Sequence, residues 1–255
     1  MERQIKVLVT AGDTYELMDD VRRITHMATG RLGCLIADEF ARSGAAVTLL
    51  CGERSARPAL DMAKTVEIQG VLSLQDAMKK LLAETQFDAV IHSMAVSDYT
   101  VRGLTAEDDI ADALLKNGDV LNVHDENQFR AQLQDAVNNA MYTSTGKISS
   151  DLPSVVVLLD RAPKVISHVK QMQPHTLLVG FKLLSDVSEQ ELLEAAQKQM
   201  QTSGSDFVLA NDLATIDGDT HSGMLIGRQG ILDRPSTKQE IAQSIVRRIT
   251  QTIGE

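Results

Sequence analysis

Small residues at the entrance to a predicted helix are the strongest chemical signal in this chain. Thr29, Gly30 and Gly33 open a helical pattern that ends at Gly44. Gly12 closes the short apolar run that precedes it. Small residues leave the first N–H groups of a helix accessible, and the helix dipole adds partial positive charge there. The arrangement is typical of a phosphate site, although glycines here are also ordinary turn residues, so a plain packing turn stays open.

A phosphorylated ligand would need cations supplied locally, because the formal net charge is −10. The same charge, without a long run of Lys and Arg, argues against nucleic acid as a partner. The basic side chains that we expect to provide positive charge are Arg22, Arg23, Arg31, Lys147 and Lys182.

Length and composition favour one large α/β domain over residues 1–255, since 43% of the 255 residues are hydrophobic. Cys34 and Cys51 show neither metal spacing nor a disulfide framework, so we expect small core residues in a reducing compartment and no protein metal site. No apolar run approaches the roughly 18 residues of a membrane span, and no signal-peptide pattern is visible. We therefore expect a cytoplasmic protein without a membrane partner.

The elements that would position these residues alternate along the chain. Strands are predicted at 7–9, 47–50, 66–68, 89–94, 155–159, 177–181 and 207–210. Helices are predicted between Gly30 and Gly44 and at 74–85, 162–172, 189–202 and 239–252. This alternation predicts a Rossmann-like, doubly wound α/β fold, with a mostly parallel sheet and helices on both faces. Segments 224–226 and 230–232 are expected to form a hairpin at the sheet edge.

Parallel sheets bind ligands at the carboxyl ends of their strands. That rule selects four segments, AGDT, SMAVSDYT, GFKLLSD and ANDL. Residues 100–145 interrupt the alternation, because they are polar, have helix-like stretches at 111–115 and 129–136, and have no clear strand. We interpret this insert as a disordered segment, a lid or a dimerisation arm.

Seven segments, in this order, carry a resemblance to a known family: VTAGDT, VRRITHMATGRLG, SMAVSDYT, GKISS, APKVISHVKQMQP, GFKLLSD and LANDL. The chain resembles phosphopantothenate–cysteine ligase, also called phosphopantothenoylcysteine synthetase, over nearly its full length. It lacks the flavin-dependent decarboxylase half of many bacterial versions, so we expect a stand-alone form. The resemblance implies an amide formed between 4′-phosphopantothenate and cysteine through an acyl-nucleotide, in coenzyme A biosynthesis. It also implies CTP or ATP as co-substrate with Mg²⁺, and a homodimer with a shared site.

The resemblance also implies roles for individual residues. Phe181 would pack against the base and Asn211 would hydrogen-bond the nucleotide, although Phe181 can also be a core residue. The full set implied to bind the nucleotide is Gly12, Thr29, Gly30, Gly33, Phe181, Lys182 and Asn211.

The substrate and catalytic roles that the resemblance implies fall on other segments. Ala95 and Asp98 would contact the pantothenate arm, and Arg22, from the neighbouring subunit, would help to hold it. Lys147 would meet the triphosphate, and loss of this cation would slow the first half-reaction, in which negative charge builds on the phosphates. Asp98 can also simply end its strand.

Two positions depart from the family pattern. Asp13 stands where the family has a second glycine, and it would repel a phosphate unless Mg²⁺ lay between them. His26 stands where the family typically has an asparagine that bonds the acyl-nucleotide carbonyl, a bond that an imidazole can also donate. These departures motivate an alternative, a non-catalytic nucleotide-binding homologue. An NAD(P)-dependent oxidoreductase is a weaker alternative, since no Tyr-x-x-x-Lys pair is present.

Overall fold

The computed structural model describes residues 3–116, 125–142 and 146–254. The chain divides into two compact units, each of which is described by itself. The sheet unit comprises Met1–Thr14, His26–Ser97 and Pro163–Glu255, and the hairpin unit comprises Tyr15–Thr25 and Asp98–Ala162. The expectation of a single folding domain stays a prediction.

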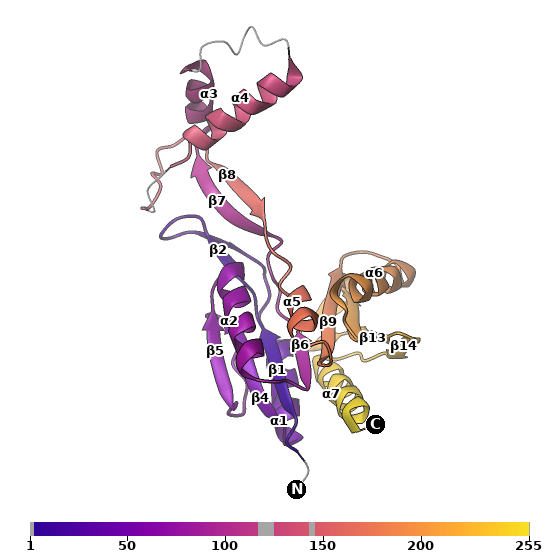
Figure 1. The fold of residues 1–255 in the computed structure, drawn as a ribbon. Helices are drawn as coiled ribbons and strands as arrows, with labels where there is room; N and C mark the ends of the chain where they lie inside the picture. Colours follow the sequence, from indigo (N-terminus) through magenta and orange to yellow (C-terminus); the bar gives the residue numbers. More distant parts are fainter. Residues whose placement is uncertain (1–2, 117–124, 143–145, 255) are drawn as a thin grey trace. The chain divides into compact units, whose positions relative to one another are not determined.

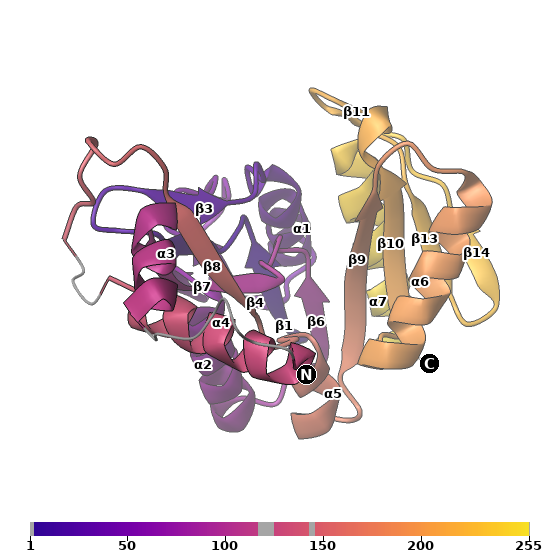
Figure 2. The same ribbon diagram turned by 90° about the horizontal axis from the view of Figure 1, so that it is seen from above.

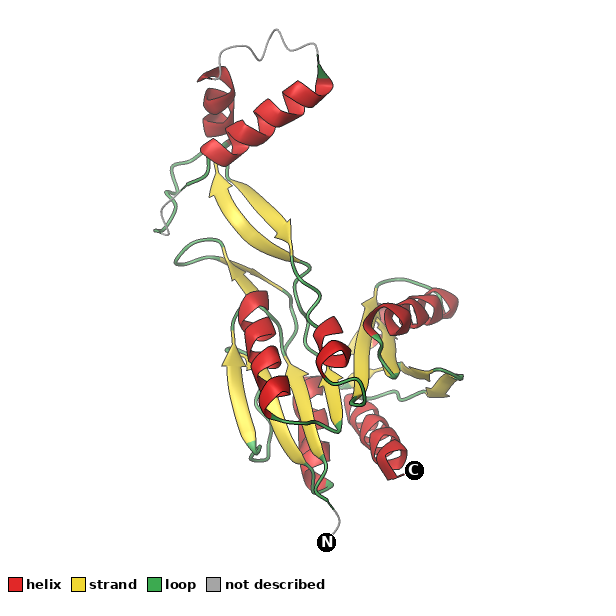
Figure 3. Cartoon of the chain, in the orientation of Figure 1, coloured by secondary structure: helices red, strands yellow, loops and turns green. Residues whose placement is uncertain are grey.

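The sheet unit is built on eight strands in the order β14-β13-β10-β9-β6-β1-β4-β5 (Figures 1 and 3). Six of them are parallel: β1 Lys6–Ala11, β4 Ala46–Gly52, β5 Lys64–Ile68, β6 Ala89–His92, β9 Leu177–Leu184 and β10 Phe207–Asp212. The hairpin β13 Met224–Gly227 and β14 Gly230–Asp233 adds the antiparallel edge, as predicted. The predicted Rossmann-like, mostly parallel sheet is confirmed.

Helices cover both faces of this sheet, as Figure 2 shows. On one face lie α1 Arg31–Arg42 and α7 Lys238–Gly254, which pack against each other. On the other face lie α2 Val71–Glu84, α5 Ser167–Met172 and α6 Glu189–Ser203. A short helical turn, η2 Leu213–Thr215, and the two-stranded β11 Ile216–Asp217 and β12 Thr220–His221 follow β10.

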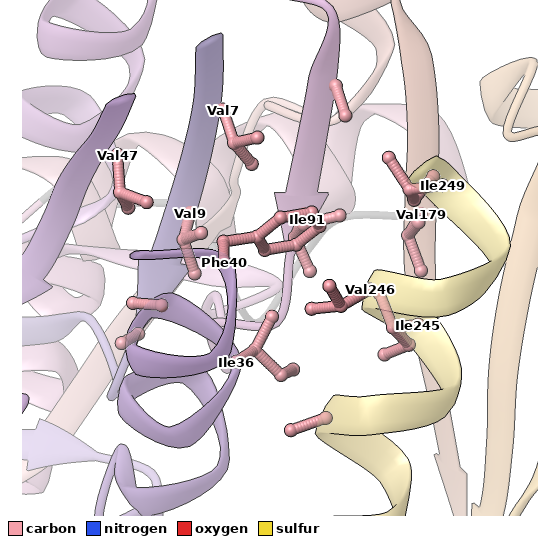
Figure 4. Close-up of a cluster of buried hydrophobic side chains, with 14 of the residues drawn as sticks. Val7, Val9, Ile36, Phe40, Val47, Ile91, Val179, Ile245, Val246 and Ile249 are labelled. Carbon is pink, nitrogen blue, oxygen red and sulfur yellow. The ribbon is translucent and has the colours of Figure 1, made fainter. Parts of the chain in front are cut away.

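The main core lies between the sheet and the α1/α7 pair (Figure 4). Phe40 of α1 lies beside Ile91 of β6, and Ile245 of α7 faces Val179 of β9. Phe40 is only 1% exposed, and truncating such a ring to alanine typically costs about 3–5 kcal/mol. Cys34 and Cys51 are free and buried, and burial raises the pKa of the Cys34 thiol to about 11. They are core residues, as expected.

Strand order creates a switch point between β1 and β6. From β1 the chain first runs outward through β4 and β5, and then returns to β6, β9 and β10 on the other side of β1. Connections therefore leave the carboxyl ends of β1 and β6 in opposite directions, and doubly wound sheets bind ligands at such a switch point. The segments AGDT and SMAVSDYT follow these two strands.

The hairpin unit contains two antiparallel strand pairs and two helices. The strand pairs are β2 Tyr15–Leu17 with β3 Arg23–Thr25, and β7 Tyr99–Thr105 with β8 Val156–Arg161. The helices are α3 Glu107–Lys116 and α4 Glu126–Asn139, which pack on each other. These two helices include the helix-like stretches predicted in the insert. Residues 117–124 and 143–145 of the insert lie outside the described part of the chain.

Three predictions about elements were wrong. The apolar run 155–159 is no strand of the central sheet, because β8 pairs with β7 and is half-exposed. The insert does contain a strand at its start: β7 includes Arg102 and Gly103, which break the apolar pattern, and a register shift between Val101 and Gly103 accommodates them. The helix predicted at 162–172 begins only at Ser167. Pro163 disfavours helical geometry at Ala162, and residues 165–166 form a turn instead of helix.

Candidate functional site

The turn after β1 pairs with the segment after β6. The Ala95 N–H donates to the Gly12 carbonyl at 2.9 Å, and the Thr14 N–H donates to the Ala95 carbonyl at 3.1 Å. Asp13 and Ala95 thereby form an isolated parallel bridge beyond the ends of the two strands. Two positions that the sequence singled out separately, Gly12 and Ala95, are therefore neighbours at the switch point.

The N-terminus of α1 lies against the same turn. Gly30 is its N-cap, in the left-handed conformation with φ 78°, and no side chain caps the helix. The first turn has no acidic residue, and the Arg31 N–H donates a long hydrogen bond of 3.4 Å to Thr29 Oγ1. A helix start without an acidic residue or a side-chain cap from its N-cap residue carries partial positive charge and suits an anion.

The glycines at this turn are required by the packing of the protein itself. A Cβ on Gly12, where φ is +89°, would lie 1.6 Å from Ser55 Oγ. A Cβ on Gly30 would lie 3.0 Å from the Gly12 nitrogen. Gly33 has no room either, since its Cβ would lie 2.7 Å from Ala11 Cβ. Packing within the protein is therefore enough to explain why these positions are glycine. Close approach of phosphates to them stays a prediction.

Strand alternation places Phe181 and Asn211 on the same face of the sheet as α1. Phe181 is paired with Leu209 and packs against the α1/α7 core. Asn211 follows Leu209 by two residues, and side chains two apart on a strand point to one face. Asn211 is 5% exposed, so it is a buried amide at the carboxyl edge. The two residues expected at the nucleotide therefore share a face with the Gly30 turn.

Lys182 leaves β9 on the opposite face. It is paired with Ala210, whose side chain belongs to the cluster beneath α6. The alternation that carries Phe181 toward α1 therefore carries Lys182 toward α6. Its contact with a nucleotide stays a prediction and would require the side chain to reach around the strand end.

His221 is a partner of Asn211 that sequence reasoning missed. Its Nε2 lies 2.9 Å from Asn211 Nδ2, and its Nδ1 is buried without a hydrogen-bond partner among the described residues. Burial, reinforced by the positive charge of Lys238, lowers the pKa of His221 to about 4. His221 is therefore neutral near neutral pH and orients the Asn211 amide. It ends the two-residue strand β12 in a polar stretch, which gives no pattern that could have revealed it.

The arginines expected to provide local positive charge are engaged within the protein. Arg31 pairs with Asp219 at 3.1 Å, and the Arg23 guanidinium stacks 4.5 Å from the centre of the Tyr15 ring. Lys147, by contrast, is exposed and has no hydrogen bond or ion pair with any described residue.

The remaining predicted site residues divide between the two units. His26 is exposed in the sheet unit, beside Met27, whose side chain is fully exposed. Arg22, Asp98 and Lys147 belong to the hairpin unit. The Asp98 carbonyl accepts the Ala162 N–H at 2.9 Å, which ties together the two ends of that unit's long segment.

In the hairpin unit, Arg22 and the residue after Lys147 are brought together. Arg22 Nη2 donates to the Ile148 carbonyl at 2.9 Å. The same guanidinium forms an ion pair at 2.7 Å with Asp19, a buried carboxylate that sequence reasoning did not select. Fold and turn thus define a Rossmann-like α/β protein with an anion-suited helix start at the sheet's switch point.

Comparison with solved structures agrees with this class. A DNA/pantothenate metabolism flavoprotein from Streptococcus pneumoniae is 32% identical and matches with a TM-score of 0.79, over 97% of this chain and 99% of that one. The C-terminal domain of a coenzyme A biosynthesis bifunctional protein CoaBC has the same fold, with a TM-score of 0.66 at 22% identity over 98% and 96% of the two chains.

Sequence comparison defines the family. The model of the DNA/pantothenate metabolism flavoprotein C-terminal domain matches residues 3–122 and 136–253. The chain belongs to this family. A coenzyme A biosynthesis bifunctional protein CoaBC from Thermococcus kodakarensis is 32% identical over 94% of this chain. The chain spans about half the length of such relatives, 49% in this case. In the described part of the chain, no helix is both long enough and apolar enough to cross a membrane.

Proposed function

We propose that the protein is a phosphopantothenate–cysteine ligase, which joins 4′-phosphopantothenate to cysteine through an acyl-nucleotide in coenzyme A biosynthesis. The observation that carries the proposal is family membership over nearly the whole chain, with a coenzyme A biosynthesis protein as a 32% identical relative. A structure with the same fold, of a Cab2 mutant, is a complex with phosphopantothenate-cysteine. These relatives favour neither the non-catalytic homologue nor the oxidoreductase.

Within this proposal we assign the following roles to the residues. The triphosphate would lie at the start of α1, with its base toward Phe181 and Asn211 on the same face of the sheet. Ala95, which pairs with the Gly12 turn, would contact the pantothenate arm together with Asp98. Lys147 would supply a cation to the triphosphate, and His26 would donate a hydrogen bond to the acyl-nucleotide carbonyl.

Mg²⁺ would be held mainly by the triphosphate. Among the described residues, no cluster of three or more His, Cys, Asp or Glu side chains could hold a metal ion. Mg²⁺ commonly uses one or two carboxylates together with phosphates and water, and Asp13 is the carboxylate at the β1 turn. Asp13 is the residue that would be adjacent to such an ion.

The test is pyrophosphate release by purified protein, measured separately with ATP and CTP. We expect release that requires phosphopantothenate, and amide product that also requires cysteine. The faster nucleotide identifies the co-substrate, a choice that the proposal leaves to the experiment. Nucleotide binding without release under any combination would overturn the ligase proposal in favour of the non-catalytic homologue.

We also propose a homodimer that forms through the hairpin unit, in the cytoplasm. Its β2–β3 hairpin exposes apolar side chains, with Leu17 57% and Val21 64% exposed, and a second copy of the chain could cover them. Sedimentation should show a dimer at micromolar concentration that Val21→Asp weakens. Leu72→Asp, which changes a 59% exposed leucine on α2, is the control. A fully active monomer would refute the dimer.

A further inference from the structure

Asp19, a carboxylate of the hairpin unit that accepts several hydrogen bonds, has no role in the function proposed above. Its side chain is only 2% exposed. Its Oδ1 accepts the N–H groups of Val21 at 2.9 Å and Arg22 at 2.7 Å. Its Oδ2 accepts Arg22 Nε at 2.9 Å and the Ile148 N–H at 3.3 Å. Asp19 therefore joins the β2–β3 turn to a segment more than a hundred residues later in the chain.

Both backbone polar groups of Ile148 are held by this pair. The N–H donates to Asp19, and the carbonyl accepts from Arg22 Nη2 at 2.9 Å. The Ile148 side chain is also buried, at 9% exposure. The N–H that Asp19 accepts belongs to the Lys147–Ile148 peptide bond, so the contact fixes the backbone directly beneath an exposed lysine.

Only an ionised carboxylate suits this arrangement. Burial by itself would raise the pKa of Asp19, but the donors from Val21, Arg22 and Ile148 outweigh burial and hold the pKa well below its usual range. Every neighbour that faces Asp19 in these contacts is a donor, so an amide in its place would point N–H toward N–H. The sequence offered no pattern for this link, because the partners are distant in the chain.

We propose that Asp19 is a positioning residue that, together with Arg22, fixes the Lys147 segment, residues 146–149, so that the Lys147 ammonium is presented in one place. As a statement about catalysis it rests on the proposed ligase function. An exposed lysine loses rotamer and backbone freedom when it meets a phosphate, and a backbone fixed beforehand lowers that cost. Arg22 accordingly acts on the lysine segment as well as on any substrate.

Limited trypsin digestion tests the anchoring without reference to activity, because trypsin cleaves after Lys147. In Asp19→Asn, cleavage of the Lys147–Ile148 bond should quicken on the order of tenfold, the effect of losing one hydrogen bond to a charged group. Cleavage after Arg228, whose side chain is 83% exposed in the sheet unit, is the internal reference for trypsin activity, and an unchanged circular dichroism spectrum excludes general unfolding. Asp20→Asn, at the exposed neighbouring position, should match wild type. A Lys147–Ile148 cleavage rate that Asp19→Asn leaves unchanged relative to Arg228 overturns the proposal.

A double-mutant cycle on pyrophosphate release tests the catalytic part. If Asp19 acts through Lys147, Asp19→Asn lowers kcat about tenfold or more in a protein with Lys147, and has no further effect in Lys147→Ala. Losses that multiply would show that Asp19 acts independently, and would overturn the positioning role. If wild type releases no pyrophosphate with either nucleotide, the ligase proposal fails while the trypsin result still decides the anchoring.

Discussion

Acid sensitivity at His92 offers a quantitative test of the burial around the switch point. His92 ends β6 at 8% exposure, with Nδ1 3.2 Å from the Thr10 hydroxyl. Burial lowers its pKa from 6.5 to about 4. Because the folded-state pKa lies below the unfolded one, the unfolded chain takes up a proton first as the pH falls. The stability contributed by neutral His92 is therefore complete above about pH 6.5 and is lost as the pH falls to about 4.

The size of the loss follows from the shift. A difference of about 2.5 pKa units at about 1.4 kcal/mol each gives roughly 3 kcal/mol of unfolding free energy. Urea denaturation, followed by far-UV circular dichroism because the chain has no tryptophan, should be measured across this pH interval. His92→Gln should lower the unfolding free energy at every pH. It should also reduce, by about 3 kcal/mol, the loss of unfolding free energy between about pH 6.5 and about pH 4. Replacement of the exposed His175 by glutamine is the matched control. Parallel curves for His92→Gln and wild type would refute the reasoning.

Three further substitutions probe the turn and the proposed chemistry. Gly33→Ala should lower the urea midpoint, because a methyl group at this position would overpack against Ala11. Overpacking typically costs about 1–3 kcal/mol, whereas the higher helix propensity of alanine stabilises by only about 1 kcal/mol. A raised midpoint would contradict this prediction. Lys147→Ala should slow pyrophosphate release on the order of 10²–10³-fold with an unchanged circular dichroism spectrum, and wild-type release would remove Lys147 from the mechanism. His26→Asn should raise the rate of amide formation relative to pyrophosphate release, and an unchanged ratio would mean that His26 is only a loop residue.

Much of the sheet unit could be predicted, because its strands and helices carry periodic patterns within the chain. The run 7–9 and the helix after Gly30 appear in the structure as β1 and α1. The strand β7 could not be predicted, since Arg102 and Gly103 interrupt its pattern and the register shift that tolerates them is a property of the strand pair. Likewise the run 155–159 is apolar enough for a central strand, and only its pairing with β7 places it elsewhere.

The sequence by itself determined the class of fold, the family and the position of the glycine turn, because each depends on residue types at short spacing. Tertiary structure alone decided which partners those residues have. Gly12 meets Ser55 and Ala95, Asn211 meets His221, and Asp19 holds the peptide bond that follows Lys147. These contacts join residues far apart in the chain, and a buried polar group is satisfied by whichever donor the fold brings to it, which local sequence does not specify.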